Sequence, residues 1–256
     1  MRVVVALLGL LVASCGDTTG GALVKFSAVA KGATGDGPIS FATGSGAKVS
    51  LDKAHLHVGA VYLNQTVPTS GSAPESCISQ GLYVGEVYGP LDVDLLSSAA
   101  QPFPNGGDGT TTQARTAEVW LTGGDINATD DNTVILDLEG TAQLDAGTLP
   151  FTATVTIAGN RLPAVTDPSL PSADPICRQR IVSPLLVDLT PAAGGQLTLQ
   201  IDSRRLLDSV DFSTQWPADG GAPASTIPDD PTGAGGGLFR GLHSSAVYQF
   251  SWSASP

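Results

Sequence analysis

Two of the chain's three histidines, His55 and His57, stand two positions apart where apolar and polar residues alternate. The alternation predicts a strand, and residues two apart in a strand leave the same face of the sheet. Two such imidazoles can converge on one copper or zinc ion, because both metals accept neutral ring nitrogen. A pair of solvated histidines is the competing interpretation. His243 could be a third ligand only if the strand that follows it pairs nearby. The residues expected on the opposite face are Leu56, Val58, Ala60 and Tyr62.

A tryptophan stands on the polar side of another predicted strand. Trp120 alternates with apolar residues, so it would share a face with Glu118 and Thr122. Such an indole can cover a loop, bind a sugar ring, lie beside a metal or simply pack against a long side chain. Trp216, in a long glycine-rich segment, is a second candidate for a sugar-stacking surface.

Acidic residues cluster at two places without completing a catalytic or metal-binding pattern. The loop 125–132 is rich in oxygen ligands, but Asp130 stands where a calcium-binding EF-hand needs glycine, and Leu136 where it needs glutamate. We therefore expect a solvated hairpin turn there. Asp92 and Asp94 share one strand face, as the carboxylates of a glycosidase can, yet an exposed pair needs no catalytic explanation.

Composition and missing motifs narrow the class of function. Twelve basic against 24 acidic residues give a net charge of -12, which leaves no broad cationic surface for nucleic acid. The sequence has no GxSxG, HExxH or Walker motif, and no GxGxxG between a predicted strand and a helix. We therefore expect a protein that is not an enzyme.

The first fifteen residues form a targeting segment. A positive charge at Arg2 precedes an apolar run, Val3–Val12, which is too short for a membrane-spanning helix of about 20 residues. The run ends in Val12-Ala13-Ser14-Cys15, which resembles the lipobox of bacterial lipoproteins. The resemblance implies that residues 1–14 are cleaved as a signal peptide and that Cys15 is acylated. An ordinary secretory signal, in which Cys15 is incidental, stays open as the alternative.

The resemblance to lipoproteins also implies a location. Residues 15–22 contain mainly glycine, threonine and other small residues, as a flexible tether does. Gly16 stands where many lipoproteins retained at the inner membrane have aspartate. We therefore expect attachment to the outer membrane, with the protein facing the periplasm or the cell exterior. The membrane is then one partner, reached through the lipid, and nucleic acid is not expected to be another.

The two remaining cysteines are expected to pair. With Cys15 used for the lipid, Cys77 and Cys177 would lie in a compartment that permits oxidation. Neither belongs to a CxxC motif, so nothing indicates a zinc site or a thioredoxin-like dithiol. A bridge that closes so long a loop would stabilise the fold by about 4 to 5 kcal/mol.

Hydrophobic periodicity predicts an all-β fold over residues 23–256. Apolar residues recur at intervals of two in most segments, and clusters of Gly, Pro, Asn and Asp separate these segments. We expect one domain, an antiparallel β-sandwich of about nine or ten strands. Two glycine- and proline-rich loops, 100–112 and 215–237, interrupt the pattern, and residues 203–209 form the best candidate for a short helix. The strands with the clearest alternation lie at 134–138, 151–157 and 197–201.

Parts of the chain resemble a known family of copper-binding proteins. The segment 41–47 leads into 49–63, and later 197–202 runs into 205–212. Their order after the lipid signal is similar to that in the periplasmic β-sandwich proteins associated with methanobactin gene clusters. The resemblance implies that His55 and His57 are copper ligands and that Trp120 is the candidate for oxidation. The chain departs from the family in having no histidine-rich start and no methionine besides Met1.

Three functions remain open at this point. The leading hypothesis is a lipid-anchored binding protein of the cell envelope, with a copper site at His55 and His57 as its sharpest form. An alternative is an envelope structural or assembly protein that grips other proteins through a sheet edge or the loops 100–112 and 215–237. Another is a carbohydrate-binding module that stacks sugars on Trp120 or Trp216.

Overall fold

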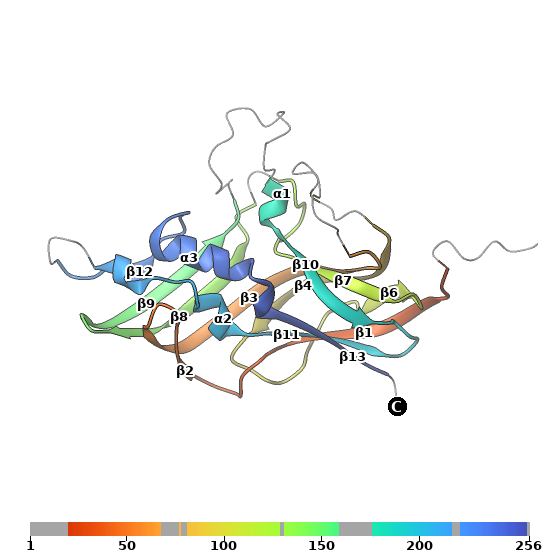
Figure 1. The fold of residues 1–256 in the computed structure, drawn as a ribbon, viewed down its shortest axis with the longest axis horizontal. Coiled ribbons are helices and arrows are strands. Elements are labelled where there is room, and N and C mark those ends of the chain that lie inside the picture. The colour runs from red at the N-terminus through yellow and green to blue at the C-terminus, as the bar shows by residue number, and fades with distance from the viewer. Residues whose placement is uncertain are drawn as a thin grey trace, which may run out of the picture.

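The computed structural model describes residues 20–67, 77, 81–128, 131–158, 176–216 and 221–254. Strands dominate these ranges, and short helices lie between the later strands (Figure 1). The strands are β1 (Leu23–Gly32), β2 (Ile39–Ala42), β3 (Lys48–Asn64), β4 (Tyr83–Asp94), β5 (Gln101–Pro102), β6 (Gly107–Thr110), β7 (Ala114–Trp120), β8 (Val134–Leu144), β9 (Gly147–Thr156), β10 (Ile181–Leu189), β11 (Gln196–Ile201), β12 (Thr226–Ile227) and β13 (Tyr248–Ser253). The helices are α1 (Ile176–Gln179), α2 (Ser203–Leu207) and α3 (Gly233–Leu242), with 3-10 turns η1 (Phe212–Gln215) and η2 (Ser245–Val247).

The strands form one mixed sheet in the order β12-β9-β8-β3-β4-β6-β1-β11-β13. The 17-residue strand β3 is its organising element. Along one side β3 pairs first with β8 and then with β7, and β7 continues the sheet to β10. The sheet curls, so that β10 and β13 contact each other although they end different branches. The apolar side chains of the inner face fill the space that the curled sheet encloses.

The expectation of a mainly β chain is confirmed, but the strands are not all antiparallel. β1 pairs with β11 in parallel, and β12 pairs with β9 in parallel. The sheet is therefore open and mixed, and the structure does not show a purely antiparallel sandwich. Alternation predicts which face of a strand is buried, but it carries no information on the direction of a partner that lies far away in the sequence.

A β-bulge at Gly59 divides β3 into two halves with opposite alternation. Register shifts between Val58 and Ala60, so that Val61 and Leu63 are buried after the bulge. Ala60 and Tyr62 thus point to the same face as the histidines, and the expectation that they would lie opposite is wrong. Glycine is required because a Cβ at position 59 would stand 2.2 Å from the carbonyl oxygen of Thr122.

The two long loops contain regular structure that their composition concealed. Residues 100–112 include β5 and β6, and residues 215–237 include β12 and the start of α3. Helix α2 confirms the short helix expected at 203–209. Helix α3 was not expected, because glycine disfavours helices. Its glycines allow close packing: a Cβ at Gly241 would lie 2.0 Å from the carbonyl oxygen of Leu206 in α2.

No helix within the described ranges is long and apolar enough to cross a membrane. The sequence also predicted that the apolar run near the N-terminus is too short to do so, but that run lies outside the described residues.

Candidate functional site

His55 and His57 lie next to each other on the outer face of β3, as the sequence predicts. The neighbouring strands place a carboxylate beside each of them. His57 is opposite Asp92 of β4, and His55 is opposite Asp94 of β4 on one side and Asp137 of β8 on the other. Leu56 and Val58 between and after them are completely buried. The alternation around the histidines therefore produces a polar stripe across three strands.

His57 is oriented by its hydrogen bond to Asp92. The Nδ1 atom lies 2.6 Å from Asp92 Oδ1, and the His57 side chain is only 13% exposed. A carboxylate only accepts hydrogen bonds, so Nδ1 carries the proton in this contact. In the neutral ring the lone pair is then on Nε2, which is buried and has no hydrogen-bond partner. A histidine held in this way by a carboxylate is the usual arrangement of a metal ligand.

A shallow cavity of about 320 Å³ adjoins both histidines. On its other side Lys53 donates a hydrogen bond to Asp137. That hydrogen bond and the charge of the Asp137 carboxylate raise the pKa of Lys53. The lysine is therefore charged and forms an ion pair with Asp137. The lining residues are Lys53, His55, His57, Asp92, Val134, Ile135 and Asp137.

The site contains two candidate metal ligands, the imidazoles of His55 and His57. Among the described residues no group of three or more His, Cys, Asp or Glu side chains is arranged to hold a metal. The Nε2 atom of His57 has no hydrogen-bond partner, and the ring of His55 is exposed. Both can bind a metal ion that takes its other ligands from solvent or from a second molecule.

His243 does not join this site. Its Nδ1 lies 2.9 Å from the Phe239 carbonyl oxygen and its Nε2 lies 2.7 Å from the Gln179 carbonyl oxygen. Both ring nitrogens thus form hydrogen bonds with backbone carbonyl oxygens. The strand after His243 is β13, which pairs with β11 and not with β3. The condition for a third ligand at His243, a following strand that pairs nearby, is therefore not met, and the residue instead joins helix α3 to α1.

Trp120 lies on the same face as Glu118, as predicted, and its indole already has a hydrogen bond and a ring contact. The Nε1 atom donates a hydrogen bond to Glu118 Oε2 at 3.0 Å, and the ring centroid lies 4.5 Å from that of Tyr62. Trp120 also packs on a small cluster with Ile126, Ile181 and the disulfide. It does not line the cavity beside the histidines. Packing is therefore the role that these contacts show, and Trp216 likewise packs against the main core.

The disulfide between Cys77 and Cys177 is confirmed. The two Cα atoms lie 5.6 Å apart across a sequence separation of 100 residues. Cys177 is buried in α1, so the bridge ties down this short helix just before the start of β10. Cys15, the expected lipidation site, lies outside the described residues.

The acidic loop at 125–132 forms local turn contacts where it is described. Asp125 Oδ1 accepts the amide of Asn127, and Asp131 accepts hydrogen bonds from Thr133, Thr122 and Gly123. Burial alone would raise the pKa of the Asp131 carboxyl, but these hydrogen bonds outweigh it and hold the pKa at about 2. The contacts agree with the interpretation of a turn.

A cluster of tyrosines on the outer face was missed by sequence reasoning. Tyr62 lies at its centre, with ring centroids 5.7 Å from Tyr83 and 5.9 Å from Tyr88. Hydrogen bonds to Tyr62 and to Glu86 raise the pKa of Tyr88. The cluster exists because the bulge at Gly59 turns Tyr62 outward, and a glycine inside a strand was the only signal that could have indicated this.

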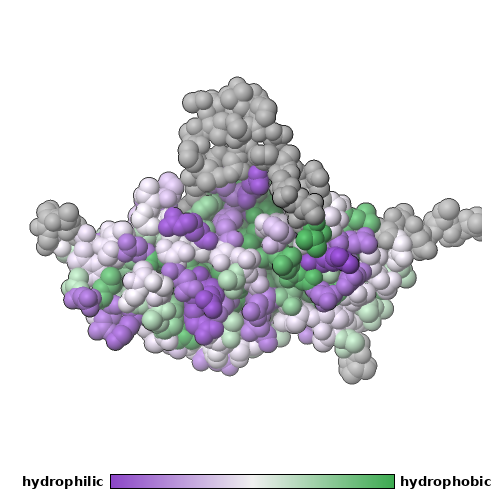
Figure 2. All heavy atoms as spheres, viewed as in Figure 1, coloured by the Kyte–Doolittle hydropathy of each residue, from purple (hydrophilic) through white to green (hydrophobic). Residues whose placement is uncertain are grey.

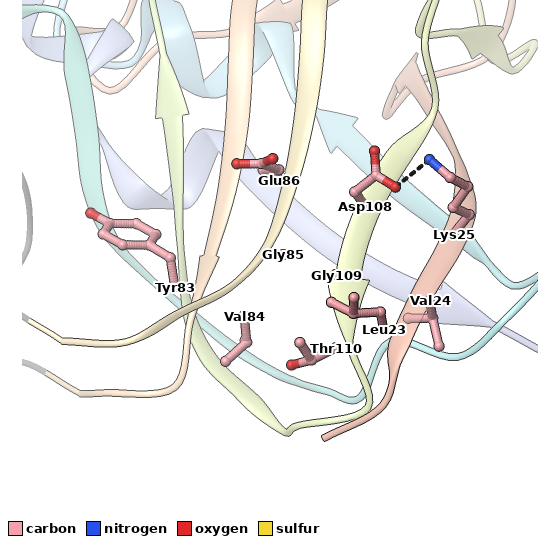
Figure 3. Close-up of a pocket in the computed structure, with 10 residues that line it drawn as sticks. All are labelled: Leu23, Val24, Lys25, Tyr83, Val84, Gly85, Glu86, Asp108, Gly109 and Thr110. Atoms are coloured by element: carbon pink, nitrogen blue, oxygen red, sulfur yellow. Dashed lines mark hydrogen bonds and ion pairs between the residues drawn. The ribbon is translucent and has the colours of Figure 1, made fainter. Parts of the chain in front are cut away.

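A second cavity, of about 490 Å³, lies over β4, β6 and β1. Figure 3 shows Tyr83 and Glu86 of β4 on one side of it and Lys25 of β1 on the other. Lys25 pairs with Asp108 of β6 at 2.6 Å. The hydroxyl of Thr110, also on β6, is buried there without a hydrogen-bond partner.

Comparisons with protein-family models, curated proteins and solved structures found no match for this chain. The function is therefore argued from its own residues.

Proposed function

We propose that this protein is a lipid-anchored binding protein of the cell envelope that binds copper through His55 and His57. In this proposal Cys15 carries the lipid, and Gly16 after it directs the protein to the outer membrane. The chain acts as a binding protein and not as an enzyme.

The arrangement of His57 carries the proposal. The bond from Nδ1 to Asp92 fixes the ring, and Nε2 is left buried without a partner. A buried polar atom without a partner costs free energy, and a bound ion is one way in which its hydrogen-bonding capacity is used. Metal binding fits this arrangement, because a ligand nitrogen must be kept deprotonated and correctly oriented.

The surroundings favour a cation. Asp92 and Asp94 stand next to the two histidines on β4, whereas Asp137 on β8 is already paired with Lys53. The negative charge of Asp92 and Asp94, on a chain of net charge -12, attracts positive ions to this face. Neutral imidazole suits copper, which stands above the other first-row divalent metals in affinity for such ligands. With two protein donors the site would hold copper loosely enough to pass it to another molecule.

The disulfide supports the location. Disulfides persist in oxidising compartments such as the periplasm and are rare in the cytosol. The Cys77–Cys177 bridge therefore agrees with an exported protein, as the leader and the lipobox-like residues predict.

Competition titration tests the copper site. The full processed protein would be titrated with Cu(I) and with Cu(II) against a coloured chelator, and Zn(II) would be titrated in parallel. We expect one copper per chain and a loss of affinity of at least about tenfold in His57→Ala and in His55→Ala. Asp92→Asn should weaken binding less, because it removes only the group that orients His57.

The third histidine supplies the matched control. His243→Gln removes an imidazole whose nitrogens are both bonded to the backbone, so copper affinity should stay unchanged although stability falls. If the double variant His55→Ala/His57→Ala keeps its circular dichroism spectrum and binds copper as tightly as the wild type, the copper site is wrong. If zinc binds more tightly than copper, the proposed metal is wrong, but the assignment of His55 and His57 as the ligands stands.

A further inference from the structure

Large apolar side chains that stay exposed are few in the described part of the chain, and they are unevenly placed. Leu23 is 81% exposed and Leu186 is 77% exposed. Val67 and Leu82 are also exposed. These four residues are here called the apolar rim. The residues of this kind outside the rim are Tyr88 and Val134. A single exposed leucine is ordinary, but exposed apolar residues that lie together mark a contact with a membrane or a partner.

Three members of the apolar rim adjoin one another through the strands that carry them. Leu186 pairs with Thr116 of β7, whose hydroxyl donates to the carbonyl of Thr66, the residue before Val67, at 2.8 Å. The amide of Gln65 donates to the carbonyl of Leu82 at 2.9 Å.

Leu23 completes the rim from the other side of β6. It lines the same cavity as Tyr83, the neighbour of Leu82 in the sequence (Figure 3). In Figure 1 β1 begins at the right-hand end of the long axis of the molecule. Figure 2 shows green, hydrophobic side chains gathered in the right half of the view. The rim thus occupies the end of the sheet at which the chain enters the fold.

The tether to Cys15 is short. The chain is fixed at Ala22, whose amide and carbonyl both bond to Thr111 at 3.0 Å. Ala22 follows Cys15 by seven residues. Seven residues span at most about 23 to 25 Å, whereas a domain of this size is about 45 Å across. An acylated Cys15 therefore keeps this end of the molecule near the bilayer and prevents it from turning away freely.

We propose that the apolar rim rests on the lipid bilayer, with Leu23 and Leu186 inserted among the headgroups of the membrane that holds the acyl chains. This inference rests on the proposed anchoring at Cys15. The anchor brings the rim to the surface, and the leucines then fix the orientation of the domain by leaving water. Arg115, which is exposed on β7 next to Thr116, can face anionic headgroups at the same end.

Spin labelling of the full acylated protein tests the orientation. Acylation converts Cys15 to a thioether, and Cys77 and Cys177 are joined, so one introduced cysteine is the single thiol that a nitroxide can label. The label would be placed by Leu82→Cys in the rim, or by Val134→Cys on β8 as the control. The protein is reconstituted in vesicles of phosphatidylethanolamine and phosphatidylglycerol. Power saturation then compares access of oxygen, which enters lipid, with access of a nickel chelate, which stays in water.

The label at position 82 should be accessible to oxygen and shielded from the chelate, and the label at 134 should show the reverse. Leu23→Gln/Leu186→Gln should abolish the shielding at 82, and Val134→Gln should leave it unchanged. Equal chelate access at both labels, in protein whose acylation mass spectrometry confirms, would overturn the proposal and leave the anchor standing. Shielding that persists in the Leu23→Gln/Leu186→Gln variant would also overturn it. A mass spectrum without acyl chains at Cys15 would remove the anchor and the proposal together.

Discussion

Arg180 should be among the residues on which the stability of this fold depends most. It follows α1 and is 1% exposed, although it carries a full positive charge. Its guanidinium donates to the carbonyl oxygen of Ile157 from Nε at 3.1 Å and from Nη2 at 2.6 Å. Nη1 donates to the carbonyls of Asp125 and Ile126, both at 3.1 Å. The side chain thereby joins the end of β9, the loop after β7 and the start of β10.

Replacing it by methionine, Arg180→Met, keeps an unbranched apolar stem and removes the guanidinium with all of its donors. Three carbonyl oxygens then lose a charged partner. The Asp125 carbonyl keeps the amide of Ala128. The carbonyls of Ile126 and Ile157, in contrast, are buried acceptors, and each one left unsatisfied costs roughly 1 to 3 kcal/mol. Allowing for water that enters the gap, we expect the free energy of unfolding to fall by about 3 to 5 kcal/mol. Urea denaturation followed by tryptophan fluorescence and circular dichroism measures this change.

An exposed arginine provides the control. Arg204 pairs with Asp202 at 2.8 Å, and its side chain is 48% exposed. Arg204→Met should therefore cost less than about 1 kcal/mol. If Arg180→Met costs no more than Arg204→Met, with an unchanged m-value, the buried guanidinium does not hold these three segments together and the reasoning is refuted.

Two further predictions concern stability. Cys77→Ala/Cys177→Ala should lower the free energy of unfolding by about 4 to 5 kcal/mol, because the bridge closes a loop of some hundred residues; an unchanged urea midpoint would contradict this. Asp131→Asn should destabilise the protein at neutral pH by about 1 kcal/mol or less after screening by solvent. The depressed pKa of Asp131 means that its contribution is complete above its unfolded pKa near 3.9 and is lost as the pH falls toward 2. The difference from wild type should shrink steadily as the pH falls from about 4 to about 2, and a constant difference from pH 2 to 7 would refute it.

The features that sequence reasoning predicted are those that depend on local pattern. Strict alternation predicted β8, β9 and β11, because one face of each is buried. The pairing of Cys77 and Cys177 was predicted from the cysteine count and from the expectation of export, and the pairing is confirmed. The common face of His55 and His57 followed from the period of a strand.

The features that were missed depend on contacts between distant segments. The bulge at Gly59 exists because the carbonyl of Thr122 comes too close for any side chain. Helix α3 forms despite its glycines, because those glycines let it approach α2. The ring nitrogens of His243 are occupied by carbonyls of α1 and α3, which no spacing in the sequence indicates. In each case tertiary contact outweighs local propensity.

The two proposals place the copper site at a definite height above the membrane. β3 carries the histidines near its middle and ends at Asn64, close to the apolar rim. The seven residues from His57 to Asn64 span about 23 Å along an extended strand. When the rim rests on the bilayer, His55 and His57 therefore stand about 20 Å from it along the strand, above the headgroups and open to a soluble partner. If the label at position 82 proves to lie in water, the predicted distance between the histidines and the bilayer is wrong. The copper titration is unaffected, because it depends only on β3, β4 and β8.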